Sequence, residues 1–253
     1  MLPIQEKKFS RVSRVSRAIF RLNSYQKAMK TADQISEFTV YRLSIYKRCL
    51  EHLEREHVKT ISSKDFASRF GLNSAQVRKD LAYFGEFGIR GMGYPVTTLK
   101  EQILLILGLA EISQGKKTWK VIVIGAGKLG AAISQYKDLR AQGFEIVAVF
   151  DNDLENAPYL AQQRVNILQT AWPLSHIHQL ETVIAAQHVD LALLAVPAEA
   201  AQAITDRLVK AGIRAILNFA PVQLLAPESI KIRTVDVIAE LQSLTYYLHT
   251  IKK

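Results

Sequence analysis

The sequence predicts an α/β protein in which a winged-helix domain precedes a Rossmann-type domain with a parallel sheet, followed by a C-terminal helix. Three observations support this prediction. A helix-turn-helix pattern leads into glycine-rich residues at 62–96, a glycine-rich loop joins a predicted strand to a predicted helix at 121–130, and strands then alternate with helices. We expect the parts to be an N-terminal extension at 1–36, a winged-helix domain at 37–112, a Rossmann domain at 118–235 and the C-terminal helix at 236–253.

The composition is that of a folded, soluble chain. Apolar residues make up 49% of the 253 residues, which indicates packed cores. The longest apolar stretch, near residues 103–112, is far below the ~18 residues of a membrane span. The single cysteine, Cys49, can form neither an intrachain disulfide nor a zinc site, and we interpret it as a core residue. A reducing cytoplasm is therefore expected.

The net charge of +10 is confined to the first hundred residues. Residues 1–36 carry eight Lys/Arg against two acids (+6), residues 37–100 carry eleven against seven (+4), and residues 101–253 carry fourteen against fourteen (0). A basic half joined to a neutral half suits a protein that binds a polyanion with one part and a small ligand with the other. A solvated basic surface is the alternative.

The first 36 residues leave three interpretations open. Their arginines stand at positions that would share one face of a helix, and acids are scarce: Arg11, Arg14, Arg17 and Arg21. The segment resembles an organelle transit peptide, could follow DNA phosphates as a basic arm, or is a poorly ordered extension. We place no site residue in it.

Two helices are expected before the turn of the helix-turn-helix pattern. Apolar residues at helical spacing predict the first from Ser36 to about Glu56. Ser62 and Asp65 have the S-x-x-D spacing of a capping box and predict the start of a second, short helix. Gly71 can adopt the left-handed conformation that ends it.

A third helix has the character of a recognition helix. Ser74 can cap it, and Val77, Leu81 and Phe84 fall in one narrow sector at ~100° per residue. The opposite arc carries small residues that allow close approach to a groove and polar residues that can reach base edges and phosphates. The DNA-binding residues expected on this helix are Ser74, Gln76, Arg78, Lys79 and Tyr83.

Glycines at 85, 88, 91 and 93 follow the third helix. They indicate a tight hairpin that exposes Arg90, as a winged-helix wing does when its tip enters the minor groove. The alternative is a flexible linker. The aromatic and aliphatic residues between the glycines argue against it, because they favour an ordered element that packs. A further helix from Leu99 to Leu109 would close the domain.

The glycine-rich loop predicts a dinucleotide site. A strand at 119–124 leads into G-x-G-x-x-G at 125–130, in which the first glycine permits the turn, the second lets the pyrophosphate approach and the third allows close packing. A second strand at 145–150 ends in Asp151, whose carboxylate can bond both ribose hydroxyls and repel a 2′-phosphate, which favours NAD(H) over NADP(H). The expected loop residues are Gly125, Ala126, Gly127, Lys128, Leu129 and Gly130.

The remaining sequence extends the sheet and shows no catalytic group. Segments 189–196, 198–211 and 213–219 predict a strand, a helix and a strand. The six histidines have neither a paired acid nor metal spacing, so we expect no enzyme and no metal site. Apolar residues recur at helical spacing from Asp236 to Ile251. This helix could close its own domain, or exchange between the subunits of a homodimer that binds two half-sites.

Taken in order, these motifs resemble the redox-sensing transcriptional repressor Rex family over residues 37–250. The resemblance is carried by SSKDFASRFGLNSAQVRKDLAYFGEFGIRGMGY, GAGKLG, Phe150-Asp151, AVPAEAAQ at 195–202, NFAP at 218–221 and TVDV at 234–237. It implies a homodimer that binds operator DNA when NADH is scarce and releases it when NADH occupies the Rossmann domains.

The resemblance also implies roles for individual residues. Arg78, Lys79 and Tyr83 match the recognition helix and Arg90 the wing, while the glycine loop and Asp151 match the cofactor site. Tyr136 matches a tyrosine near the nicotinamide. Arg48 and Asp236 match a pair whose intersubunit salt bridge belongs to the switch.

Three departures concern details of this pattern: the long N-terminal arm, Pro95 after Tyr94, and Asn152-Asp153-Leu154 in place of D-x-D-P. Two other functions remain open. One is a transcription factor whose Rossmann domain binds another ligand, such as a coenzyme A ester, and the other is an NAD-dependent oxidoreductase.

Overall fold

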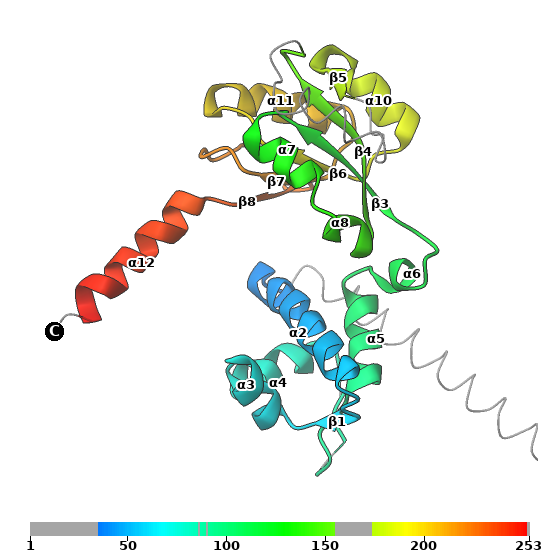
Figure 1. Ribbon diagram of the computed structural model, residues 1–253, viewed down its shortest axis with the longest axis vertical. Coiled ribbons are helices and arrows are strands. Elements are labelled where there is room, and N and C mark those ends of the chain that lie inside the picture. The colour runs from blue at the N-terminus through cyan, green and yellow to red at the C-terminus, as the bar shows by residue number, and fades with distance from the viewer. Residues whose placement is uncertain (1–34, 86, 90, 155–173, 252–253) are drawn as a thin grey trace, which may run out of the picture. The chain divides into compact units, whose positions relative to one another are not determined.

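A computed structural model describes residues 35–85, 87–89, 91–154 and 174–251. Residues 1–34 of the N-terminal extension and the predicted wing residue Arg90 lie outside the described residues. The chain divides into two compact units (Figure 1), with the boundary between Gln114 and Gly115.

The first unit is a helical head with a small two-stranded sheet. Its long helix α2 and the pair α3 and α4 enclose one apolar core, to which α5 contributes Val96, Leu99 and Ile103. The most completely buried side chains include Leu43, Leu50 and Leu53, all from α2. The elements are α2 (Glu37–Arg55), β1 (Thr60–Ile61), α3 (Ser63–Phe70), α4 (Ser74–Ala82), β2 (Tyr94–Pro95), α5 (Val96–Ile106) and α6 (Ala110–Ser113).

The beginnings of α2 and α3 follow the expected capping. The hydroxyl oxygen of Ser36 accepts a hydrogen bond from the backbone N–H of Thr39, and that of Ser62 accepts one from Asp65 at 3.0 Å. The Ser62 hydroxyl also donates to the Asp65 carboxylate at 2.6 Å. Helix α3 ends at Gly71 with φ +64°, the left-handed conformation that the sequence predicted.

The cap of α4 lies one residue earlier than expected, so the prediction that Ser74 caps this helix is wrong. Asn73 has the extended backbone of an N-cap, and its side-chain oxygen accepts from the N–H groups of Ala75 at 2.9 Å and Gln76 at 3.0 Å. Ser74 is the first helical residue. Asparagine and serine are nearly equal as caps, so their identities alone do not place the boundary.

The glycine-rich segment between α4 and β2 turns back on itself at a single bridge, and the wing expected at Arg90 stays a prediction because Arg90 lies outside the described residues. Strands β1 and β2 pair antiparallel, with Ile61 opposite Tyr94, and a further bridge joins Ile89 to Gly93. Gly93 has φ +89° and lies against the carbonyl oxygen of Ile61 so closely that no Cβ would fit. The close contact of Gly93 with β1 therefore requires a glycine at this position.

Helix α5 begins earlier than the predicted helix at 99–109 and also ends earlier. Pro95, with φ −65°, stands at its N-cap, and the helix runs from Val96 to Ile106. Gly108, at φ +69°, then separates it from the single turn α6. Proline is compatible with a helix start and glycine with a helix end, which accounts for the shift.

The second unit is a Rossmann-type domain. Six strands of its described residues are all parallel in the order β5-β4-β3-β6-β7-β8, so the order reverses beside the first strand, β3. The predicted strands at 119–124 and 145–150 are β3 and β4; β5 and β8 were not predicted. The strands are β3 (Trp119–Ile124), β4 (Phe144–Asp151), β5 (Leu174–His176), β6 (Leu191–Leu194), β7 (Ala215–Asn218) and β8 (Lys231–Thr234).

Helices cover both faces of this sheet (Figure 1). Alternate residues of β3 point to opposite faces: Val123 joins Ala131 of α7 in one cluster, and Ile122 joins Leu180 of α10 and Leu208 of α11 in the other. The helices that the structure describes in this unit before the tail are α7 (Lys128–Ser134), α8 (Asp138–Ala141), the 3₁₀ turn η3 (Ile177–Gln179), α10 (Leu180–Gln187) and α11 (Ala198–Lys210).

The C-terminal helix α12 (Val237–Ile251) buries none of its residues. The Asp236 carboxylate caps it by accepting from the N–H of Ala239 at 3.0 Å. Of the two expectations for this helix, closing its own domain is therefore wrong, and exchange between subunits stays a prediction. Its large exposed apolar side chains are Val237, Ile238, Leu241, Leu244, Tyr246, Tyr247, Leu248 and Ile251.

Candidate functional sites: a recognition helix and a nucleotide loop

Helix α4 separates its side chains as the sequence predicted. Val77 and Leu81 are buried, and Phe84 just beyond the helix is buried with them. Arg78, Lys79 and Tyr83 are exposed on the other side. This outer face carries two cations and a phenol, which can contact phosphates and base edges.

The other predicted DNA-binding residues of the head are less exposed or lie outside the described residues. Ser74 and Gln76 are half-buried, and the Gln76 amide nitrogen donates to the Asp80 carboxylate at 2.7 Å. Arg78 reaches back to α3, where its guanidinium donates to the Ser63 hydroxyl at 3.0 Å. That contact holds the Arg78 side chain against the first turn of α3.

Asp80 is a residue that the sequence analysis missed. It is fully buried in α4 and lies in the sector of Val77 and Phe84, where an apolar residue would be expected. Arg42 of α2 binds it with two nitrogens, at 2.5 and 2.7 Å, and Tyr46 donates its hydroxyl at 2.8 Å. The sequence could have indicated this residue, because an acid at an inward-facing position of a helix requires a buried partner.

The electrostatics of this cluster favour an ionised Asp80. Burial alone would raise the pKa of Asp80, but hydrogen bonds from Arg42, Tyr46 and Gln76 and the charge of Arg42 outweigh it, so the pKa lies below its ordinary value. Burial, followed by the hydrogen bond to Asp80, raises the pKa of Tyr46. The carboxylate therefore accepts every hydrogen bond that it makes.

The nucleotide loop has the backbone that each of its glycines was predicted to provide. Gly125 turns at φ +97° beneath the carbonyl of Ala195, and Gly130 packs on the carbonyl of Gly125; neither leaves room for a Cβ. At Gly127, the N-cap of α7, an added Cβ would meet nothing within 4 Å. Open space at that position suits a pyrophosphate beside the helix N-terminus.

Asp151 lies at the carboxyl end of β4, next to this loop. One carboxylate oxygen accepts from the backbone N–H of Ala126 at 2.6 Å and the other from Asp153 at 3.0 Å. The side chain is half-exposed, so lone pairs remain for a ligand. The structure thus brings the predicted ribose ligand and the loop together at the point where the strand order reverses.

The other predicted cofactor and switch residues are distributed differently. Lys128, Leu129 and Tyr136 are exposed on or just after α7, whereas Ala126 in the loop is buried. Arg48 lies in the first unit and Asp236, the cap of α12, in the second. Their salt bridge therefore stays a prediction.

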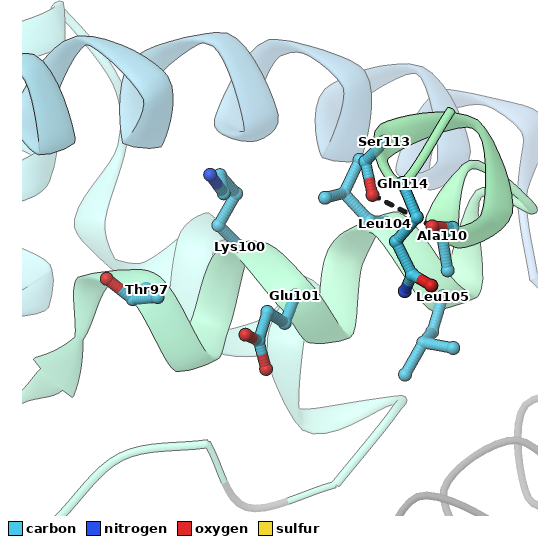
Figure 2. Close-up of a pocket in the computed structure, with 8 residues that line it drawn as sticks. All are labelled: Thr97, Lys100, Glu101, Leu104, Leu105, Ala110, Ser113 and Gln114. Atoms are coloured by element: carbon cyan, nitrogen blue, oxygen red, sulfur yellow. Dashed lines mark hydrogen bonds between the residues drawn. The ribbon is translucent and has the colours of Figure 1, made fainter. Parts of the chain in front are cut away.

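A separate pocket of about 240 Å³ lies between α5 and α6 in the first unit. Figure 2 shows Thr97, Lys100 and Glu101 along α5 and Ser113 on α6 at its wall. Lys100 is paired with Glu54 of α2. None of the predicted site residues lines it. Among the described residues, no group of three or more acids, histidines or cysteines could hold a metal, and no helix is long and apolar enough to cross a membrane.

A head with an outward basic helix and a Rossmann-type domain with an open phosphate loop define a class: DNA-binding regulators that respond to a nucleotide. Comparisons with family models agree with both halves. A model described as "Putative DNA-binding protein N-terminus" matches residues 34–82, and one described as "CoA binding domain" matches residues 116–222.

The chain belongs to the redox-sensing transcriptional repressor Rex family. The Rex of Carboxydothermus hydrogenoformans is 46% identical over 84% of this chain and 96% of its own. That of Desulforamulus reducens is 43% identical over 85% and 96%. This membership agrees with the prediction that the chain is a regulator and not an enzyme.

Solved structures of one protein, RSP, described as a Rex-family repressor, have the same fold. Its complex with β-NAD⁺ and operator DNA superimposes with a TM-score of 0.72 at 33% identity, covering 86% of this chain and 94% of RSP. Its complex with β-NADH gives 0.69 at 32% identity, covering 86% and 96%.

Proposed function

We propose that this protein is a transcriptional repressor that binds operator DNA when NADH is low and releases it when NADH binds. The observation that carries the proposal is the presence, on one chain, of an outward basic helix in the head and of a phosphate loop with Asp151 beside it. The membership of the Rex family indicates that NADH binding releases the DNA.

The DNA contact is assigned to the outer side of α4 and to the predicted wing. Lys79 and Arg78 supply charge for phosphates, Tyr83 and Gln76 reach base edges, and Ser74 lies at the helix N-terminus. Arg90 belongs to the same proposal as the wing residue. Phosphate contacts would set the register of the head, and base contacts its sequence preference.

The nucleotide contact is assigned to the loop at 125–130 and to Asp151. The open space at Gly127 would accept the pyrophosphate, with Lys128 beside it, and the Asp151 carboxylate would bond the ribose. The same charge would repel a 2′-phosphate, so NADH is preferred to NADPH. Tyr136 is assigned to the nicotinamide end.

The switch is assigned to a homodimer held by α12. Reduced nicotinamide carries no positive charge, so NADH could occupy a closed, apolar subunit pair that NAD⁺ would enter only at a desolvation cost. Closure would move two recognition helices that must stand about 34–36 Å apart on DNA, and the Arg48–Asp236 pair would change with it. The protein would act in the cytoplasm.

A coenzyme A ester is the second candidate ligand, because the family model that matches the Rossmann domain is described as CoA-binding. Asp151 favours a ribose with free hydroxyls, and coenzyme A carries a 3′-phosphate on its ribose. NADH is therefore the first choice.

The test is a titration of the protein on an operator duplex at fixed salt, repeated with excess NADH, NAD⁺, NADPH and acetyl-coenzyme A. Release by NADH alone supports the proposal. Equal DNA binding in all four arms would show that the Rossmann domain serves another purpose, and release by the thioester would transfer the proposal to that ligand.

A further inference from the structure

The buried carboxylate of Asp80 does more than join two helices, because one of its partners belongs to the proposed DNA contact. Its first oxygen, Oδ1, accepts from Arg42 at 2.7 Å, from Gln76 at 2.7 Å and from Thr39 at 3.5 Å. The second, Oδ2, accepts from Arg42 at 2.5 Å and from Tyr46 at 2.8 Å. Asp80 thus ties Gln76, one turn earlier in α4, to α2.

The chemistry of this contact orients the Gln76 amide. An ionised carboxylate can only accept hydrogen bonds, so the end of the amide that faces Asp80 must be the NH₂ group. One of its two N–H bonds is used there. The carbonyl oxygen Oε1 and the second N–H are left, and no described residue has a hydrogen bond to Oε1 in the structure.

This remaining pair matches one base better than another. In the major groove adenine presents an acceptor, N7, beside a donor, the 6-amino group, whereas guanine presents two acceptors, N7 and O6. An amide with one N–H and one oxygen available complements adenine. Against guanine it would need both N–H bonds, of which Asp80 holds one, or it would place Oε1 against O6.

We propose that Asp80 is a positioning residue that holds the Gln76 amide with its oxygen available, so that Gln76 selects adenine over guanine at one position of each operator half-site. This inference rests on the proposed function, because it requires α4 to enter the major groove. Arg42, Tyr46 and Thr39 keep the carboxylate in place. Asp80 itself does not contact DNA.

The experiment starts from the duplex that the natural chain selects out of a randomised pool. Binding is then measured with adenine or guanine at each position of the half-site. We expect one position with a preference for adenine of roughly 5- to 150-fold, and we expect Gln76→Met to abolish it there while leaving the other positions unchanged. Gln114→Met, at an exposed glutamine after α6, is the matched control.

Asp80→Asn tests the positioning role separately. It should abolish the same preference at the same position, and it should add nothing in the Gln76→Met background. The readout is a ratio of affinities for two duplexes, so a loss of folded protein cancels. A purely structural Asp80 would lower the stability and the affinity for every duplex while leaving the ratio intact, and that result would overturn the proposal.

Base analogues test the contact on the unaltered chain, which makes the result independent of whether the Asp80 variant folds. Purine in place of the selected adenine removes the 6-amino donor, and 7-deazaadenine removes the N7 acceptor. Each should weaken binding by the natural chain but not by Gln76→Met. Equal sensitivity of both proteins would overturn the assignment of Gln76. If the natural chain selects no DNA sequence from the pool, the proposed function itself is overturned, and not only the role of Gln76.

Discussion

The backbone N–H of Ala126 donates to the carboxylate of Asp151 across 2.6 Å, which joins the phosphate loop after β3 to the end of β4. The two residues are 25 positions apart in the chain. The same carboxylate that is proposed to bind the ribose therefore also supports the loop that is proposed to bind the pyrophosphate. Loss of Asp151 should affect both parts of the nucleotide.

Asp151→Ala should weaken NADH binding by roughly 10- to 150-fold, since a hydrogen bond to a charged group contributes about 1.5–3 kcal/mol. The affinity for NADPH should fall less, because the repulsion of its 2′-phosphate disappears with the carboxylate. Calorimetric titration with both nucleotides measures the ratio of the NADH affinity to the NADPH affinity. Asp138→Ala, at an exposed acid of the same unit, is the control, and an unchanged ratio would remove Asp151 from the ribose site.

Two glycines of the loop should respond differently to alanine. Gly130→Ala places a methyl group against the carbonyl of Gly125 and should lower the free energy of unfolding by about 1–3 kcal/mol. Gly127→Ala meets no atom within 4 Å and has an ordinary φ of −64°, so the fold should be retained while NADH binding is lost. Denaturant unfolding and NADH titration of both variants check this. Retained NADH binding by Gly127→Ala would place the pyrophosphate elsewhere.

Lys79→Ala should weaken the binding of all DNA sequences alike. If Lys79 contacts a phosphate, the slope of log K against log salt should become shallower by about 0.9 for each phosphate that the variant no longer neutralises. Affinity is measured at four or five salt concentrations on operator and on unrelated DNA. Lys210→Ala, at an exposed lysine of the other unit, should leave the slope unchanged. An unaltered slope for Lys79→Ala would exclude the phosphate contact.

The Glu181–Arg207 pair between α10 and α11 should make stability depend on acidic pH. Hydrogen bonds from Arg207 lower the pKa of Glu181 from 4.5 to about 2. A carboxyl whose pKa is lowered by folding stabilises the folded state fully above its unfolded pKa, and this contribution is lost as the pH falls from about 4.5 toward 2.

The Glu181 carboxylate is 46% exposed, so its contribution is at most about 1 kcal/mol. Glu181→Gln should therefore destabilise the protein slightly at pH 7 and have a smaller effect at a pH near 3. Denaturant unfolding at both values tests the sign. A loss of stability in Glu181→Gln that becomes larger at the lower pH would contradict this prediction.

Helix α12 should control assembly if its apolar side chains form the subunit interface. Leu244→Glu places a charge in that surface and should shift the protein toward monomers by at least ten-fold in dissociation constant, because an unpaired charge buried in an interface costs more than about 1.4 kcal/mol. Sedimentation at several concentrations measures this. Gln242→Glu on the same helix is the control, and a dimer that tolerates Leu244→Glu would place the interface elsewhere.

The elements that local chemistry determines were predictable from the sequence. The capping serine Ser62, the terminating Gly71 and the strand at 119–124 lie where the sequence placed them, and α11 agrees to within one residue. Each depends on side chains within a few positions or on a continuous apolar run. The three loop glycines were predictable for the same reason, because their spacing is set by the local backbone conformation of the loop.

The elements that depend on distant partners were not predictable. Strands β5 and β8 are short and lie at the two edges of the sheet, and β8 carries the exposed residues Lys231 and Arg233, so neither has an apolar pattern. Asp80 was missed for a related reason. Its buried position becomes favourable only because Arg42 and Tyr46 come from another helix.

The Asp80 cluster also bears on the mechanics of the head. Helix α4 is joined to α2 by several hydrogen bonds at one carboxylate, and α2 shares its apolar core with α5, the helix that leads toward the second unit. A torque applied through α5 would therefore turn the whole head as one stiff body. In such a body the displacement at α4 scales with its distance from the pivot, so a rotation of a few degrees is amplified into a shift at the DNA without any bending inside the head.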